Sequence, residues 1–247
     1  MAHFLVCYFQ AVSRDGRHAG HRRSRINSLK VKGAAGFTRC VQSEMDVRIE
    51  PLRKKDFNAA REFATEGMHL SWYTNNDREL YVYSRYFLYF ELTKATRALG
   101  AYVEDKLVGF LLADMNGQPK VFKSVRYRIF IKLVSFIIDL AYKNASVPYD
   151  EANREMVRAY KANHHTDGEL CFFAVDPKIN GKGIGTLLLN KLASLEKGKH
   201  IYLFTDSGCT YPFYPRRGFE EVDRKEITLI NHGKATPLTC FLFSKTL

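Results

Sequence analysis

Hydrophobic and polar positions follow a regular order along this chain from about residue 46 onward. Apolar and polar residues alternate over residues 47–52, as in a strand with one buried face. Apolar residues recur every three or four positions over residues 57–64 and again over residues 77–98, which predicts two helices. Asp77 follows two asparagines and is expected to cap the second helix. The ordered part of the chain therefore opens with a strand and two helices.

The patterns that follow are mostly those of strands. Residues 101–103 and 107–113 are two apolar runs joined by a tight polar turn, which predicts a hairpin. Residues 169–175 are almost entirely apolar, as expected of a central strand buried on both faces. The remaining expected elements are a helix over residues 184–195, strands over 201–205, within 219–230 and over 238–244, and a short helical stretch over 213–217.

A long, mostly helical insertion is expected between the hairpin and the central strand, from about residue 120 to 165. Its first half, residues 121–142, mixes Phe, Ile and Leu with Lys and Arg. Such a basic amphipathic helix can lie on a membrane surface, or it can cover one side of a substrate cleft, and both interpretations stay open. The apolar stretch 129–142 contains Lys132 and Asp139 and is too short and too charged to span a bilayer. No integral membrane segment is therefore expected.

Residues 1–44 differ in composition from the rest of the chain. They hold eight Lys and Arg against two Asp and Glu, so half of the net charge of +12 lies there. We expect residues 1–44 to be a basic, disordered leader or a non-native extension, and residues 45–247 to form the folded domain. An organelle transit peptide and a functional basic tail are the alternatives.

Composition limits the classes of protein to which the chain can belong. With 247 residues that are 46% hydrophobic and 13% aromatic, it can bury a substantial core. The basic charge invites a nucleic-acid partner, but no aromatic–basic motif or zinc-finger spacing supports one. The five cysteines are widely spaced, odd in number and without a CxxC pair. They indicate reduced thiols in a cytoplasmic protein, with no disulfide framework and no metal site.

The most informative segment is a glycine-rich loop between the central strand and the next helix. Residues 175–186 read Val-Asp-Pro-Lys-Ile-Asn-Gly-Lys-Gly-Ile-Gly-Thr. A helix that begins at such a loop exposes several backbone N–H groups and the positive end of its dipole, which together form an anion site. Gly183 and Gly185 allow phosphate oxygens to approach the main chain, and Lys178 and Lys182 add positive charge. The spacing matches neither the nucleotide P-loop nor the dinucleotide fingerprint.

Two motifs resemble those of the GNAT superfamily of N-acetyltransferases. The segment Asn180-Gly181-Lys182-Gly183-Ile184-Gly185 is similar to its Gln/Arg-x-x-Gly-x-Gly/Ala signature, with Asn180 in place of Gln or Arg. About 30 residues later, residues 213–219 read Phe-Tyr-Pro-Arg-Arg-Gly-Phe and resemble the family's Phe/Leu-Tyr-x-x-x-Gly-Phe segment. The usual Asn seven residues before the tyrosine is replaced by Ser207.

This resemblance covers most of residues 46–244, apart from the insertion, and implies the fold and the cofactor. The fold would be α/β (α+β), the GNAT-type acyl-CoA N-acyltransferase fold, with a mixed central sheet flanked by helices and a helical insertion after the first hairpin. The cofactor would be acetyl-CoA, with no metal. The residues implied to bind acetyl-CoA are Val175, Asn180, Gly181, Lys182, Gly183, Ile184, Gly185, Thr186 and Ser207.

The resemblance also implies direct transfer of acetyl from acetyl-CoA to a primary amine in a ternary complex. Tyr214 would protonate the departing thiolate, and Glu169 would accept a proton from the amine, with Asp206 and a water relay as the alternative base. A backbone N–H at Val175 or its neighbours would hold the oxyanion. The acceptor, a small-molecule or peptide amine, is not specified by the residues.

Other interpretations of the same residues stay open. The replacements at Asn180 and Ser207 permit a catalytically silent GNAT-fold module that binds acyl-CoA or another anionic metabolite as a sensor. The basic leader and the helix over residues 121–142 permit a membrane- or nucleic-acid-associated protein. A homodimer is also open.

Overall fold

The computed structural model describes residues 46–67, 70, 74, 76–141, 147–179, 182–231 and 234–247. Within these residues the strands are β1 (Arg48–Pro51), β2 (Arg97–Val103), β3 (Lys106–Met115), β4 (Gly168–Val175), β5 (His200–Asp206), β6 (Glu220–Asn231) and β7 (Lys234–Thr246). The helices are α1 (Phe57–Gly67), α2 (Asp77–Lys94), α3 (Val125–Ala141), α4 (Val147–Asn163) and α5 (Ile184–Leu195). Single 3-10 turns are η1 (Lys54–Asp56), η3 (Pro177–Ile179), η4 (Tyr211–Phe213) and η5 (Pro215–Arg217). The expectations for residues 1–44 lie outside the described part of the chain.

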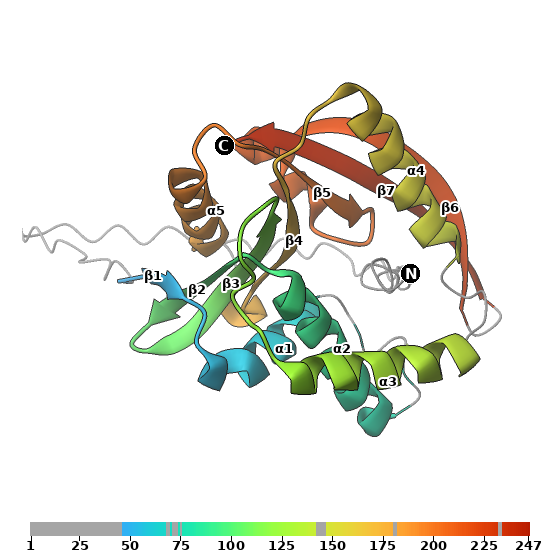
Figure 1. Ribbon diagram of the computed structural model, residues 1–247, viewed down its shortest axis with the longest axis horizontal. Coiled ribbons are helices and arrows are strands. Elements are labelled where there is room, and N and C mark those ends of the chain that lie inside the picture. The colour runs from blue at the N-terminus through green and yellow to red at the C-terminus, as the bar shows by residue number, and fades with distance from the viewer. Residues whose placement is uncertain are drawn as a thin grey trace, which may run out of the picture.

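The strands form one seven-stranded mixed sheet in the order β1-β2-β3-β4-β5-β7-β6 (Figure 1). Every neighbouring pair is antiparallel except β4 and β5, which run parallel. The parallel pair has only two register positions, Gly168 with Ile201 and Glu169 with Tyr202. Beyond them β4 stays paired with β3, and β5 stays paired with β7. The two strands therefore diverge in the middle of the sheet.

Helices cover both faces of this sheet. The helices α1, α2 and α3 pack on one face of the first half, where Phe110, Leu112 and Phe172 are buried. The helix α5 packs on the opposite face, against a cluster that includes Leu111 and Leu203. The helix α4 lies on the face opposite α5, over β6 and β7 (Figure 1). The expected fold class, a mixed sheet flanked by helices, is confirmed.

Several local expectations are confirmed and others are wrong in detail. The hairpin is confirmed as β2 and β3, and its turn residues Glu104 and Asp105 both have positive φ, 45° and 67°. The cap of α2 is Asn76 rather than Asp77, because the Asn76 side chain accepts the N–H groups of Arg78 and Glu79. The predicted helix over 77–98 ends at Lys94, and its last residues belong to β2. The short helical stretch near residue 215 consists of two 3-10 turns.

The central strand β4 is less completely buried than expected. Gly168, Leu170 and Phe172 are buried, whereas Cys171 and Phe173 are partly exposed. Complete burial was expected from the apolar sequence, but β4 loses its β5 neighbour after Glu169. Side chains in this part of the strand are therefore covered by fewer atoms than in a continuous sheet.

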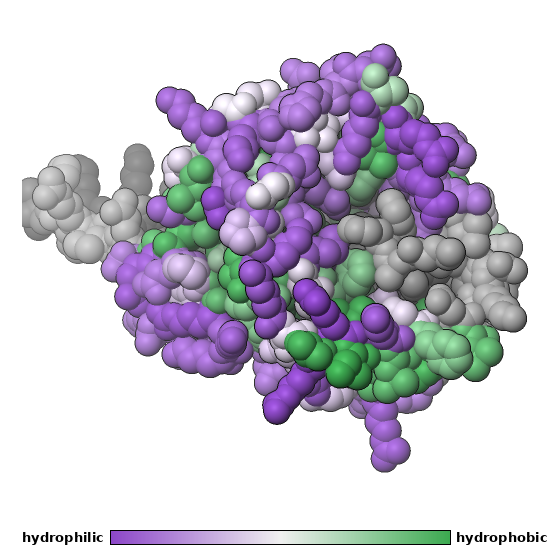
Figure 2. All heavy atoms as spheres, in the orientation of Figure 1, coloured by the Kyte–Doolittle hydropathy of each residue, from purple (hydrophilic) through white to green (hydrophobic). Residues whose placement is uncertain are grey.

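The two helices between β3 and β4 occupy most of the expected insertion. The helix α3 packs on α2, and α4 packs on the β6–β7 hairpin. Figure 2 shows an apolar band along α3 on the visible face of the molecule. Among the described residues, no helix is long and apolar enough to cross a bilayer.

Gly168 provides a test of the β3–β4 pairing. A Cβ at this position would lie 2.7 Å from the carbonyl oxygen of Asp114 and 2.7 Å from Sδ of Met115. We expect Gly168→Ala to lower the free energy of unfolding by about 1–3 kcal/mol, because backbone atoms must move to accept the methyl group. Gly67→Ala is the matched control, since a Cβ there meets nothing within 4 Å. Urea unfolding midpoints would measure both, and equal midpoints would contradict the packing described.

Candidate active site

The divergence of β4 from β5 begins at a β-bulge. The β3–β4 register passes from Ala113–Leu170 to Leu112–Phe172, so Cys171 has no partner on β3. Leu170 and Phe172 consequently pack on opposite faces of the sheet although they are two residues apart. A bulge leaves the backbone of its extra residue unpaired and locally bends the strand. The main chain at Cys171 is therefore the part of β4 that lies at the start of the divergence, four positions before Val175.

At the far end of β4 the chain enters the glycine-rich loop and α5. Gly183 is the N-cap with φ 76°, and no side chain caps the helix. The N–H of Leu187 donates to the Gly183 carbonyl, so the amides of residues 184–186 precede the first intrahelical bond. These three N–H groups point out of the N-terminal end of α5, which is the positive end of the helix dipole. Asn180 and Gly181 lie outside the described residues.

The residues predicted to bind the cofactor have different surroundings at this helix end. Ile184 is buried and packs in the core with its side chain, leaving only its main chain for a ligand. Lys182 and Gly183 are exposed, and a Cβ on Gly183 would meet nothing within 4 Å. A Cβ on Gly185 would come within 3.0 Å of both Phe173 and Phe213, so this glycine is required by aromatic packing.

Arg217, which the sequence interpretation missed, lies at the same helix end. Its Nε and Nη2 donate to Oγ1 of Thr186 at 2.9 and 2.8 Å, and Nη1 donates to the Phe213 carbonyl at 3.0 Å. The guanidinium carbon is 3.6 Å from the centre of the Phe213 ring. Burial, and then the neighbouring charge of Arg216, lower the pKa of Arg217 from its ordinary value. In the sequence, the two adjacent arginines between Pro215 and Gly218 could have indicated a cation at this site.

Tyr214 and Ser207 belong to the β5–β6 connection. Tyr214 links η4 to η5, is partly buried, and packs against the rings of Phe219 and Phe243 at 5.6 and 6.1 Å. Ser207 is exposed, and its Oγ accepts the N–H of Thr239 on β7 at 3.1 Å. The structure brings Tyr214 close to α5 through Phe213 and Arg217, whereas Ser207 is fixed to β7.

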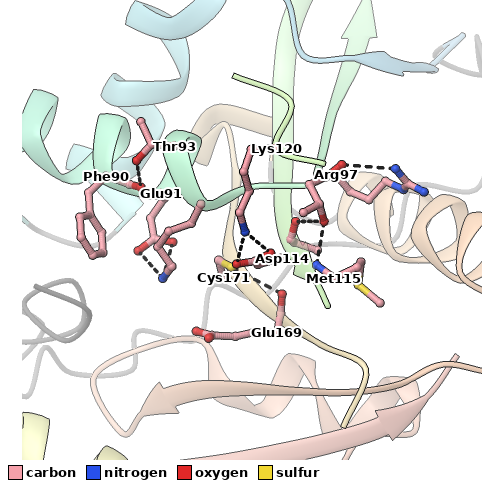
Figure 3. Close-up of polar contacts among 12 residues, drawn as sticks. Phe90, Glu91, Thr93, Arg97, Asp114, Met115, Lys120, Glu169 and Cys171 are labelled. Atoms are coloured by element: carbon pink, nitrogen blue, oxygen red, sulfur yellow. Dashed lines mark hydrogen bonds and ion pairs between the residues drawn. The ribbon is translucent and has the colours of Figure 1, made fainter. Parts of the chain in front are cut away.

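Charged side chains gather on the face of β4 opposite α5 (Figure 3). We call Glu91, Lys94, Asp114, Lys120 and Glu169 the polar cluster. Lys94 pairs with Glu91 at 3.2 Å, and Lys120 donates to both oxygens of Asp114 at 2.6 Å. On β4, Glu169 is opposite Asp114 in the β3–β4 register. The cluster thus joins α2, β3 and β4 beside the Cys171 bulge.

Glu169 is partly buried and has a defined partner on β5. The hydroxyl of Tyr202 donates to Oε2 of Glu169 at 3.1 Å, and Lys161 of α4 donates to the Tyr202 oxygen at 3.1 Å. Burial, followed by the Glu169 charge, raises the pKa of Tyr202 well above its usual value. The phenol therefore keeps its proton and remains a donor to the carboxylate.

Burial perturbs two further acids and a thiol near the divergence. Burial raises the pKa of Glu91 to about 7, opposed by the charge of Lys94. Burial also raises the pKa of Asp206, the alternative base, to about 6, although Asp206 accepts the N–H of Gly208. The pKa of the Cys171 thiol is raised well above its usual value by burial and then by Glu169. A protonated thiol is a poor nucleophile, which argues against covalent transfer through Cys171.

In chemical terms, this region offers an anion site at the end of α5 and carboxylates at the start of the divergence. Among the described residues, no group of three His, Cys, Asp or Glu side chains could hold a metal ion. A diphosphate fits the uncapped helix end, and a cationic amine fits the carboxylates.

Residues 147–221 match the family model of the acetyltransferase (GNAT) domain. This segment contains α4, β4, α5 and β5, and therefore both the anion site and Tyr214. No curated protein matches the chain.

Solved structures resemble the chain at low sequence identity. A structure from Corynebacterium glutamicum, described as histone acetyltransferase HPA2 and related acetyltransferase, is 18% identical and has a TM-score of 0.47, with 78% of this chain and 94% of that chain covered. PH1933 from Pyrococcus horikoshii is 20% identical with a TM-score of 0.49, covering 82% and 100%. Arabidopsis thaliana Naa50, in complex with the bisubstrate analogue CoA-Ac-MVNAL, is 17% identical with a TM-score of 0.43, covering 81% and 99%.

Glu91 makes stability depend on pH. Its pKa of about 7 in the folded protein exceeds the ordinary value of 4.5, so its favourable contribution is complete below pH 4.5 and is lost as the pH rises through about 7. We expect the free energy of unfolding to fall by roughly 2 kcal/mol from this group between pH 5 and 8. In Glu91→Gln this fall should disappear or reverse.

Urea unfolding at several pH values would measure the slope for the wild type, Glu91→Gln and the control Glu62→Gln. Glu62 is a suitable control because its side chain is 63% exposed. Parallel slopes for the wild type and Glu91→Gln would show that the buried carboxylate does not titrate in this range.

Proposed function

Since the domain match over residues 147–221 supports membership of the GNAT superfamily, we propose that this protein transfers acetyl from acetyl-CoA to a primary amine. The amine, on a small molecule or a peptide, would attack the thioester directly in a ternary complex. One observation carries the proposal: the diverging strand β4 leads from the polar cluster at Glu169 to the uncapped N-terminus of α5.

The helix end supports the proposed binding of the diphosphate of acetyl-CoA. The amides of residues 184–186 would donate to phosphate oxygens, and the positive end of the helix dipole would favour the anion. Lys182 and Arg217 would add two cations, and Arg217 could donate to phosphate while remaining near Thr186. Gly183 would permit close approach, because it carries no Cβ at an exposed position. Val175, Asn180, Gly181 and Ser207 complete the proposed set.

Proton transfer would involve the two catalytic residues predicted from the sequence. Glu169 would accept a proton from the incoming ammonium. Because Lys94 and Lys120 pair with Glu91 and Asp114, Glu169 would also be the carboxylate of the polar cluster that attracts this cation. Tyr214 would donate its proton to the departing thiolate, whose conjugate thiol has an ordinary pKa of about 8.5. A backbone N–H at Val175 or its neighbours would stabilise the oxyanion, and the main chain at the Cys171 bulge is a second candidate donor.

The proposal extends to the cellular location of the protein and to its need for a metal or a nucleic acid. The described cysteines, Cys171, Cys209 and Cys240, form no disulfide bond, and such reduced thiols support a cytoplasmic location. The chemistry needs neither a metal nor a nucleic acid, because the helix dipole and the side chains named above supply the required charges.

A panel of amines with acetyl-CoA and a thiol-reactive dye tests the proposed activity. Release of free CoA that depends on both the protein and one class of amine would support it. Calorimetric binding of acetyl-CoA without thiol release from any amine would instead favour an acyl-CoA-binding sensor. Absence of acetyl-CoA binding by the folded protein would contradict both functions.

Gly183→Asp tests the anion site. The new carboxylate would face the proposed phosphate position, and we expect acetyl-CoA affinity to fall by at least about 100-fold through charge repulsion. Gly117→Asp is a matched control, because both glycines have positive φ, 76° and 74°, and neither Cβ would meet an atom within 4 Å. Isothermal calorimetry would compare the two, and unchanged affinity in Gly183→Asp would remove this helix end from the site.

Tyr214→Phe tests the proposed acid. We expect kcat to fall by about 100-fold while acetyl-CoA affinity stays within about twofold, because only the proton donor is lost. Tyr211→Phe is the control, since Tyr211 is a partly buried tyrosine in the same connection that stacks on Phe241. Steady-state thiol release would give kcat. Equal rates for wild type and Tyr214→Phe would assign the proton to solvent.

A further inference from the structure

The outward face of α3 is a continuous apolar surface. Six large apolar side chains on it are between 53% and 70% exposed, and we call them the α3 stripe: Val125, Ile129, Leu133, Phe136, Ile137 and Leu140. Their spacing of three or four residues puts them on one side of the helix. Figure 2 shows this stripe as the apolar band along α3. Soluble proteins rarely leave a contiguous apolar surface of this kind in water.

The helix that carries the stripe is firmly held on its other side. Ile131 and Val134 are buried in the core shared with α1 and α2. Tyr127 stacks on Tyr89 of α2 at 4.2 Å between ring centres. The hydroxyls of Ser135 and Tyr86 are hydrogen-bonded at 3.0 Å. The stripe is thus presented to solvent by an anchored helix.

Positive charge accompanies the stripe. Four exposed cations lie in or just before the first half of α3, namely Lys123, Arg126, Arg128 and Lys132. None of them forms an ion pair with a side chain that the structure describes. The sequence of α3 contains one acid, Asp139, near the opposite end. An apolar stripe flanked by long cationic side chains therefore faces outward, and no described acid pairs with these cations.

We propose that α3 docks this protein on the surface of an anionic lipid bilayer. The stripe would enter the boundary between headgroups and acyl chains, while the four cations extend to lipid phosphates. With 17 residues, α3 is about 25 Å long and would lie in the plane of the surface. The helix thereby acts as a reversible interfacial anchor and does not span the membrane.

The α3 stripe could be covered by a bilayer or by a second copy of this chain, and the charge around the stripe distinguishes the two. Pairing two α3 helices through their stripes would bring eight cations into one interface, and the sequence of each α3 supplies a single acid to neutralise them. A bilayer with anionic headgroups offers phosphates to all the cations of one helix and an apolar layer to the stripe. Charge complementarity therefore favours the lipid surface.

Co-sedimentation of the full chain with vesicles tests the docking. Wild type, Ile129→Ser/Phe136→Ser and the control Val82→Ser/Leu195→Ser would be mixed with phosphatidylcholine vesicles containing or lacking about 30% phosphatidylglycerol, at about 150 mM salt. The control removes two apolar side chains that are 42% and 46% exposed but lie outside the stripe. The basic residues 1–44 are common to all variants, so differences report on α3.

We expect wild type and control to partition onto anionic vesicles equally, and the stripe variant to bind at least about tenfold more weakly. Arg126→Gln/Lys132→Gln should also bind anionic vesicles more weakly than wild type, with binding to neutral vesicles unchanged. Unfolding midpoints near that of wild type would show that the variants are folded. Equal binding by the stripe variant, or no binding by wild type, would overturn the proposal. A concentration-dependent dimer that only the stripe variant abolishes would assign the face to a second copy instead.

Discussion

The short parallel pairing between β4 and β5 is the interaction on which the rest of the structure depends. Two register positions hold the halves of the sheet together, and each strand then follows only its outer neighbour. Backbone groups in a continuous sheet satisfy one another, so a ligand finds no donor there. The divergence, together with the bulge at Cys171, supplies main-chain donors in the middle of the protein without giving up the antiparallel pairing on either side.

The polar cluster shows how the fold accommodates charged side chains beside the divergence of β4 from β5. Glu91 is almost completely buried, but Lys94 lies one helical turn away and pairs with it. Asp114 has Lys120, and Glu169 has the hydroxyl of Tyr202. Each carboxylate thus has its own donor, which reduces the cost of placing three acids close to a central strand.

Local patterns in the sequence predicted most of the fold. The β2–β3 hairpin, the strand β4 and the helix α5 could be predicted because periodicity and turn residues are local signals. The Cys171 bulge and the cluster around Glu91 could not, because they arise from pairing between segments far apart in the chain. The roles of Tyr214 and Glu169 came from family resemblance and stay predictions. Arg217 was missed because its contact with Thr186 depends on how the β5–β6 connection folds back on α5.

The contact between Arg217 and Thr186 has a mechanical consequence. Arg217 and Tyr214 are joined by a backbone hydrogen bond of 2.9 Å, and the carbonyl of Tyr214 also accepts the N–H of Phe219 at 3.2 Å. These two bonds to one carbonyl close residues 214–219 into a compact turn. The side chain that holds Thr186 at the start of α5 and the side chain of Tyr214 are therefore carried by one short turn, so a change in the backbone of that turn alters both positions together.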